Sequence, residues 1–199
     1  MSNIRAQNWY NGEAPRNLSG FINDKSNRLI GWAMMRQLRI KPDLCHVSGS
    51  VRQEISKCQA DYSLLNEEQR SFEPGWTNQT TTVCSSPICQ AFEYQSGDQL
   101  DSDVYMGDHG TYGSGGYVYE FRGRLFDLLS NVSQLHQLQW IDGQTRAVII
   151  QLSLYNPNVQ MFTSVSLLVE LLSTGGAFPQ ARFEPLTFQG TLLTSKSLI

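Results

Sequence analysis

The sequence predicts an α+β domain in which helices cover one face of an antiparallel β-sheet with a long hairpin, connected by long, disulfide-stapled loops. Three observations support this prediction. Apolar and polar residues alternate through 148–154 and again through 159–169, which is the period of a half-buried strand. A third alternating segment occupies 116–121. Apolar residues at helical spacing between 124 and 139 predict an amphipathic helix.

The chain has 199 residues, enough to bury one sizeable core, and this length suits one domain better than two. We expect residues 1–27 to form a polar segment that docks on the domain, 28–190 to form the domain itself, and 191–199 to form a C-terminal segment. No internal repeat is visible, so solenoid and propeller architectures are set aside.

The first ordered element is expected to begin near Arg28. The segment from Trp32 to Ile40 is ambiguous between helix and strand. Leu38 and Ile40, with Arg39 pointing outward between them, favour a strand. This strand would run into a proline that cannot extend a sheet.

Residues 51–58 place Val51, Ile55 and Cys58 at helical spacing and predict a short helix. The following segment, 61–100, holds few apolar residues and many turn formers. We therefore expect it to be mostly loop, with one strand near Phe92–Tyr94.

The strand at 116–121 is expected to place Tyr117, Tyr119 and Phe121 on one face. The helix that follows carries an apolar stripe, and Asp142-Gly143 turns the chain after it. The two strands of the long hairpin then follow, joined by Tyr155 to Asn158.

The four cysteines, Cys45, Cys58, Cys84 and Cys89, form an even set without the C-x-x-C spacing of zinc or redox sites. Disulfides are therefore the better interpretation, with four buried thiols as the alternative. Four cysteines allow three connectivities, and the spacing does not choose among them.

The formal net charge is −3, and charged residues are scattered, so the chain offers no basic stripe for nucleic acid. Lysine is scarce and polar bulk comes from Ser, Thr, Asn and Gln, which fits a secreted or lumenal protein. The charge-free run 147–169 has polar residues at its middle and is not expected to cross a membrane. The N-terminus shows no signal-peptide pattern, so an extracellular chain would be part of a larger one.

Three N-glycosylation sequons begin at Asn17, Asn78 and Asn131. About two are expected by chance in a chain of this composition, so their number alone indicates little. Asn78 is the best candidate, because it lies in a polar stretch that resembles an exposed loop, whereas Asn131 falls on the predicted helix.

The glycine-rich stretch GTYGSGGYVYEF, residues 110–121, raises the question of a phosphate-binding loop. Such a loop needs a lysine and a following helix, but here a strand follows and no lysine occurs from Gln59 to Ser195. Gly113, Gly115 and Gly116 are instead expected to be structural, forming a bend before the strand. We expect no cofactor.

Catalytic and metal sites have little support in the sequence. Four aspartates cluster between 98 and 108, but Tyr112 stands where an EF-hand starting at Asp101 would need its glutamate. A solvated acidic loop is expected, with an irregular calcium site as the alternative. Asp108 and His109 are adjacent without a nucleophile elbow, so we predict no enzyme and no catalytic residues.

Several segments together resemble the polycystin domain, over about Trp9 to Phe188. They are, in order, FINDKSNRLIGWAMMRQLRIKPDLC, Cys58, GTYGSGGYVYEF, WIDGQTRAVIIQLSLYNPNVQMF and LLVELLSTGGAFP. The N-terminal WYNGEAPRNLSGFINDKSNR and the pair Cys84 and Cys89 resemble the polycystin-1-like branch more than the polycystin-2 branch. Pro157 and Leu171-Leu172-Ser173 depart from the family pattern at strand or hairpin ends.

The resemblance implies that Cys45 and Cys58 form the family's disulfide, closing a loop that reaches a neighbouring subunit. It implies an extracellular insert between two membrane helices of a channel-like region, at the plasma or ciliary membrane, with residues 191–199 leading to the next membrane helix. The implied function is assembly and gating of a tetrameric, calcium-permeable cation channel with polycystin-2-type subunits. The alternative is an extracellular ligand- or matrix-binding module that uses the loops from Trp76 to Tyr94.

Overall fold

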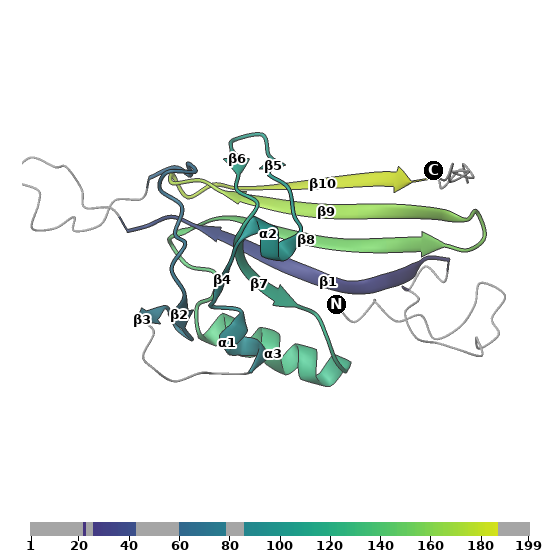
Figure 1. The fold of residues 1–199 in the computed structure, drawn as a ribbon, viewed down its shortest axis with the longest axis horizontal. Coiled ribbons are helices and arrows are strands. Elements are labelled where there is room, and N and C mark those ends of the chain that lie inside the picture. Colours follow the sequence, from purple (N-terminus) through teal and green to yellow (C-terminus); the bar gives the residue numbers. More distant parts are fainter. Residues whose placement is uncertain (1–21, 23–25, 43–59, 79–85, 187–199) are drawn as a thin grey trace, which may run out of the picture. The chain divides into compact units, whose positions relative to one another are not determined.

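The computed structural model describes residues 22, 26–42, 60–78 and 86–186. Its central feature is a six-stranded sheet with strand order β10-β9-β8-β1-β7-β4, accompanied by the two-stranded pairs β2-β3 and β5-β6 (Figure 1). The strands are β1 Arg28–Arg39, β2 Phe72–Glu73, β3 Thr77–Asn78, β4 Tyr94–Gln95, β5 Tyr105–Met106, β6 Thr111–Tyr112, β7 Gly116–Glu120, β8 Thr145–Asn156, β9 Met161–Leu171 and β10 Ala177–Leu186. The helices are α1 Pro87–Gln90, α2 Gly97–Leu100 and α3 Leu125–Gln137.

The chain divides into two compact units. The first comprises Met1–Gly31, Ser153–Val165 and Phe183–Ile199, and the second comprises Trp32–Leu152 and Ser166–Arg182. In the first unit, the rings of Tyr155 and Phe162 pack with their centroids 4.6 Å apart. Among the described residues, the second unit holds two hydrophobic clusters and the helices α1, α2 and α3.

The predicted strands at the centre of the sheet are confirmed. β1 pairs antiparallel with β7, with Met34 opposite Glu120 and Gln37 opposite Tyr117. β8 and β9 are neighbours in the sheet, as expected for the predicted hairpin. The antiparallel sheet with a few helices confirms the α+β class.

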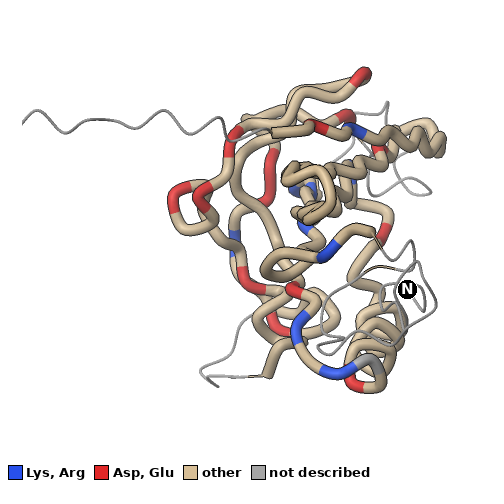
Figure 2. Tube along the Cα trace, turned by 90° about the vertical axis from the view of Figure 1, so that its right-hand side faces the viewer, with Lys and Arg blue, Asp and Glu red and all other residues tan. Residues whose placement is uncertain are grey.

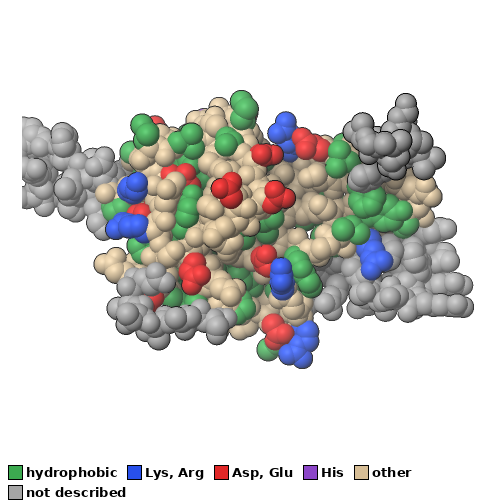
Figure 3. All heavy atoms as spheres, in the orientation of Figure 1, with side chains coloured by type: hydrophobic (Ala, Val, Ile, Leu, Met, Phe, Trp, Pro, Cys, Tyr) green, Lys and Arg blue, Asp and Glu red, His purple; other side chains and the backbone are tan. Residues whose placement is uncertain are grey.

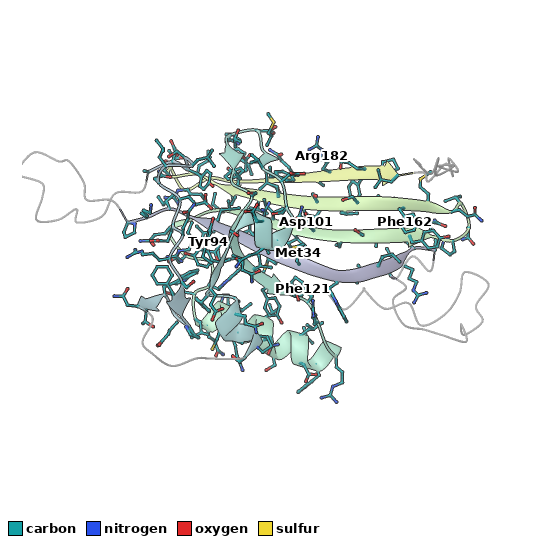
Figure 4. The ribbon with its side chains drawn as sticks, viewed as in Figure 1. Met34, Tyr94, Asp101, Phe121, Phe162 and Arg182 are labelled. Atoms are coloured by element: carbon teal, nitrogen blue, oxygen red, sulfur yellow. The ribbon has the colours of Figure 1, made fainter. Side chains whose placement is uncertain are left out.

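One face of the sheet in the second unit carries the first hydrophobic cluster. Tyr117 and Tyr119 of β7 are fully buried there against Phe92, Leu135 and Trp140. Phe121 packs against the same cluster, so the predicted shared face of the three aromatic residues is confirmed. Figure 4 shows Phe121 between β7 and α3. The helices α1 and α3 contact each other and supply the cover for this face.

The helix α3 follows the prediction closely, but its apolar stripe lies somewhat differently. Leu135 is buried and Val132 packs against the cluster, as expected of a helix with one apolar face. Leu129, which was expected in the stripe, is half exposed. Leu138, directly after the helix, packs against the cluster although it was not expected in the stripe.

The other face carries the second cluster, formed by Leu38, Tyr112, Ala147, Ile149 and Leu168. The one-turn helix α2 lies on this side of the sheet, because the guanidinium of Arg36 donates to Ser102 Oγ. Arg36 is opposite Val118 in the ladder, and successive side chains of a strand point to opposite faces. Arg36 and Val118 therefore lie on the face opposite to that of Tyr117 and Tyr119. The helices are therefore not all on one face.

The segment 61–100 is richer in short elements than the sequence predicted. The expected strand near Phe92–Tyr94 is realised as β4, whereas Phe92 lies in a turn after α1. Side-chain capping explains both short helices, with Ser86 accepting from Cys89 N and Ser96 forming a capping box with Gln99. The predicted helix at 51–58 lies outside the described residues.

Candidate functional site

The base of the loop 43–59 is the best-defined candidate site, because its two stems are described and lie side by side. We define the outgoing stem as 39–42 and the incoming stem as 60–68. Ile40 forms an antiparallel bridge with Glu67, and Lys41 N donates to Asn66 O at 2.8 Å. Glu68 N donates to Arg39 O at 2.9 Å. Backbone hydrogen bonds therefore join the stems like a short piece of sheet.

A buried arginine fixes the outgoing stem. Arg39 was expected to point outward, but it is only 3% exposed, so that expectation is wrong. Its guanidinium carbon lies 3.4 Å from the centroid of the Trp76 ring. The same group donates to Gln144 Oε1 at 2.6 Å and pairs with Asp142 at 3.0 Å.

These partners explain why Arg39 is tolerated in the interior. Burial lowers the pKa of Arg39, and the Asp142 carboxylate opposes that shift. An arginine with a lowered pKa still carries its charge at neutral pH. The cation–π contact and the ion pair compensate for part of the lost water, while Nε and Nη1 of Arg39 are buried without a hydrogen-bond partner.

A second buried arginine fixes the incoming stem. Arg146 Nε donates to Ala60 O at 2.7 Å, and Nη1 donates to both Gly143 O at 3.0 Å and Thr145 O at 2.8 Å. Burial lowers the pKa of Arg146, while Asp61 and Asp142 raise it. Because Arg146 belongs to β8, it ties the backbone where the incoming stem begins directly to the sheet.

The incoming stem then forms a tight turn that exposes two leucines. Ser63 N donates to Asn66 Oδ1 at 2.8 Å, and Asn66 Nδ2 donates to Asp61 O at 2.8 Å. At the tip, Leu64 and Leu65 are 56% and 92% exposed. A turn held by its own side chains thus presents apolar surface beside the loop.

Two consecutive glutamates of the incoming stem, Glu67 and Glu68, are buried. Glu67 accepts from Tyr94 Oη at 3.2 Å, and Tyr94 lies on β4 (Figure 4). Glu68 accepts from Arg70 at 2.9 and 2.7 Å. Burial raises the pKa of Glu68, but the hydrogen bonds from Arg70 outweigh it and hold the pKa below its ordinary value.

The glycine-rich stretch lies against these groups. Gly113 N donates to Tyr62 Oη at 2.9 Å, and a Cβ at Gly113 would come within 2.7 Å of Glu67 Oε2. A Cβ at Gly115 would overlap the Tyr94 hydroxyl. Gly116 has φ +145°, and its added Cβ would lie 2.7 Å from Gln37 O. The glycines thus sit where another backbone or side chain approaches closely.

The acidic loop is organised around a buried carboxylate that the sequence analysis did not single out. Glu170 of β9 accepts hydrogen bonds from Asp108 N at 3.2 Å, His109 N at 3.0 Å and Tyr112 Oη at 2.9 Å. His109 Nδ1 lies 2.9 Å from its Oε2, and Gln180 Nε2 donates to the same oxygen at 3.0 Å. Burial raises the pKa of Glu170, but the contacts with His109 and Tyr112 reverse the shift and leave it lowered.

The remaining predicted residues are dispersed. Asp101 is the left-handed C-cap of α2 (Figure 4), and Asp98 lies in its first turn. Within residues 22, 26–42, 60–78 and 86–186, no group of three or more His, Cys, Asp or Glu side chains could hold a metal ion. The same residues include no helix with the length and hydropathy of a membrane span.

The predicted disulfides and sequons are only partly described. Cys89 on α1 is buried and disulfide-bonded. Cys45, Cys58 and Cys84 lie outside the described residues, so the pairing stays a prediction. Asn78 is exposed on β3 and Asn131 is partly buried on α3, whereas Asn17 lies outside the described residues.

The sequence analysis missed the charged residues that build this site: Arg39, Glu67, Glu68, Arg146 and Glu170. For three of these residues, the sequence contained a signal of burial. Arg39 and Glu170 each lie between apolar residues of a strand segment, and Arg146 directly precedes such a segment. A charge in such a position is buried with a partner or ends the strand.

Over the part of the chain that the structure describes, surface charge shows no concentration that would suggest nucleic acid. Acidic and basic positions are interspersed along the trace (Figure 2). The face in Figure 3 likewise mixes acidic, basic and apolar side chains among neutral polar ones.

Comparison with known proteins identifies the family. The polycystin domain model matches residues 6–189. Polycystin-2 of Danio rerio is 34% identical over 177 residues, covering 88% of this chain and 18% of the relative. Polycystin-2-like protein 1 of Homo sapiens is 33% identical, covering 86% of this chain and 20% of the relative. Polycystin-1-like protein 3 of Mus musculus is 28% identical, covering 90% of this chain and 8% of the relative.

The chain thus spans a fifth or less of the length of these relatives, so the match concerns one domain. Both polycystin-2 and polycystin-1-like proteins are among these relatives. With the domain match covering most of its length, the chain belongs to the polycystin family.

Proposed function

We propose that this domain is the extracellular domain of a polycystin-type channel subunit and mediates the assembly and gating of a tetrameric, calcium-permeable cation channel. The polycystin domain match and the polycystin-2 relatives support the class of protein. The parent protein is membrane-embedded, and this domain lies at the extracellular face of the plasma or ciliary membrane.

The observation that carries the proposal is the anchoring of both stems of the loop 43–59. Arg39 ties the outgoing stem to Trp76 and Asp142, and Arg146 ties the incoming stem to β8. A loop built on such a base starts from a fixed position and direction. Pre-organisation of this kind lowers the entropy lost on binding, which suits a loop that contacts a neighbouring subunit.

The finer assignments belong to the same proposal. The chain comes from a polycystin-1-like member, and its partners are polycystin-2-type subunits in a hetero-tetramer. Residues 28–190 form the domain, residues 1–27 dock on it, and residues 191–199 lead to the next membrane helix. Cys45 pairs with Cys58, and Cys84 pairs with Cys89.

The test removes the proposed loop disulfide in the full-length protein. The double substitution Cys45→Ser with Cys58→Ser should reduce co-purification of a polycystin-2-type partner and reduce surface current, because the loop loses the constraint that shapes its tip. Cell-surface labelling measures delivery, so assembly can be compared at equal surface amounts.

The matched control is Cys84→Ser with Cys89→Ser, which removes the second proposed disulfide outside the loop. Its surface-delivered protein should retain partner binding and current. Normal assembly and current in the surface-delivered Cys45→Ser, Cys58→Ser protein contradict the role of the loop. An equal loss in both double variants points to general destabilisation and contradicts it as well.

A further inference from the structure

A hollow of about 580 Å³ lies beside Asn78 in the second unit. Its wall combines aromatic and polar side chains, among them Arg70, Phe72, Trp76, Asn78, Gln139 and Gln144. Asn78 begins the sequon Asn78-Gln79-Thr80, so a covalent glycan would start at the edge of this hollow.

The short hairpin β2-β3 places an aromatic ring next to the asparagine. Phe72 and Asn78 are directly opposite in the antiparallel ladder. Side chains in that relation lie on the same face of a hairpin, with Cβ atoms about 5 Å apart. Phe72 is partly exposed and Asn78 is exposed, so the ring and the amide share an accessible face.

The aromatic wall is rigid. Trp76 adopts φ +60°, an uncommon conformation for a tryptophan, and its Nε1 donates to Gln139 O at 2.9 Å. The rings of Phe72 and Trp76 pack edge to face at 5.6 Å, and Trp76 also packs on Tyr117 at 5.0 Å. The platform beside Asn78 is thus held by the first hydrophobic cluster.

The charges of the hollow are paired within the protein. Arg39 is paired with Asp142, and Arg70 with Glu68. A hollow without an uncompensated charge suits a neutral polar occupant better than an ion. The flat C–H face of a sugar packs on an aromatic ring, while its hydroxyl and acetamido groups bond to a polar rim, here the side chains of Gln139 and Gln144.

From this juxtaposition we propose that the first N-acetylglucosamine of a glycan on Asn78 packs into the hollow over Phe72. The glycan is then a structural part of the domain and stabilises the hairpin β2-β3. This inference rests on the extracellular location included in the proposed function.

The test measures how fast an amidase that cleaves the asparagine–sugar bond removes the Asn78 glycan from native full-length protein, followed by glycopeptide mass spectrometry. Phe72→Leu keeps the apolar bulk but removes the flat ring, and should accelerate release about fivefold. Phe72→Tyr keeps the ring and should leave the rate unchanged. Glycans at Asn17 or Asn131 serve as internal references whose release rates stay the same in all three proteins.

A second measurement uses the wild-type protein alone. Trimming the Asn78 glycan to its first sugar should leave the hairpin β2-β3 as resistant to proteolysis as the intact glycan does, and complete removal should make it more susceptible. Equal cleavage in the trimmed and the fully deglycosylated protein overturns the proposal, even if Phe72→Leu fails to reach the surface.

Two further outcomes also overturn it. Equal release rates for wild-type and surface-delivered Phe72→Leu protein contradict the packing and leave the assembly proposal untouched. If Asn17 or Asn131 carries a glycan and Asn78 carries none, the packing is likewise contradicted and the assembly proposal is untouched. The absence of sugar at every sequon overturns the inference and also counts against the extracellular location. This outcome therefore distinguishes failure of the proposed function from failure of the glycan inference alone.

Discussion

At the start of β7, the backbone leaves no room for a side chain at Gly116. Gly116 combines a left-handed φ of +145° with a Cβ position 2.7 Å from a backbone oxygen of β1. The carbonyl of Gln37 belongs to the central ladder and has little freedom to move. A side chain at Gly116 must therefore separate β7 from β1 locally.

We expect Gly116→Ala to lower the free energy of unfolding by about 3 kcal/mol or more, since it adds a steric clash to dihedral strain. Gly123→Ala is the matched control, because Gly123 also has positive φ, +112°, but no atom within 4 Å of an added Cβ. It should cost about 1 kcal/mol. Denaturant unfolding measures both, and equal losses contradict the steric explanation.

Ionisation of Glu170 makes the stability of the domain depend on pH. Its folded-state pKa is lowered, so its ionised form contributes stability at pH values above the unfolded pKa of about 4.3. That contribution disappears as the pH falls through the folded pKa. The acidic loop should therefore loosen from β9 in acid.

Glu170→Gln should lower the free energy of unfolding by about 2 kcal/mol at pH 7, because the buried amide cannot match the hydrogen bonds of the carboxylate. The difference from wild type should shrink as the pH falls below the unfolded pKa and through the lowered folded pKa, because wild-type Glu170 then becomes protonated itself. Thermal unfolding at several pH values measures this. Glu120→Gln, in an exposed pair with Arg122, should have little effect at any pH. A Glu170→Gln difference that stays constant from pH 7 to pH 3 argues against the assignment.

At the scale of elements, the turn 63–66 is the most exposed apolar feature next to the loop 43–59. Its hydrogen bonds fix the backbone, so Leu65 is presented without a large loss of entropy on binding. A rigid apolar tip beside a proposed contact loop suits the centre of an interface.

Leu65→Asp should weaken capture of a polycystin-2-type partner about tenfold, because a charge replaces an apolar contact. Its free energy of unfolding should change by less than about 0.5 kcal/mol, since the side chain is 92% exposed. Phe126→Asp is the matched control, with an 82% exposed side chain on α3. Quantitative co-purification measures both, and equal effects of the two substitutions place the contact elsewhere.

Sequence periodicity predicted some strands and helices correctly and missed others. The periods of β7, α3, β8 and β9 were predicted correctly, because one buried face imposes a regular alternation. β10 was not predicted as a strand. It lies at the sheet edge, is mostly exposed and contains Pro179, all of which weaken the alternation.

At the scale of the molecule, the order of strands and the partners of buried charges could not be read from local patterns. β1 lies between β8 and β7, neighbours that are distant in sequence. Arg36 illustrates the difficulty, since it donates to Ser102 and to Ser114 O. Such contacts depend on tertiary placement, which periodicity does not encode. The family resemblance implied the fold class, but the partners of the buried charges became visible only in the structure.

The anchoring of the two stems has a mechanical consequence. A loop joined to its domain by flexible ends absorbs a pull by swinging about them. Here Arg39 and Arg146 fasten both ends to the strands, and the bridge between Ile40 and Glu67 resists their separation. In the proposed assembly, a displacement at residues 43–59 therefore passes to β1 and β8 through the contacts of the two stems.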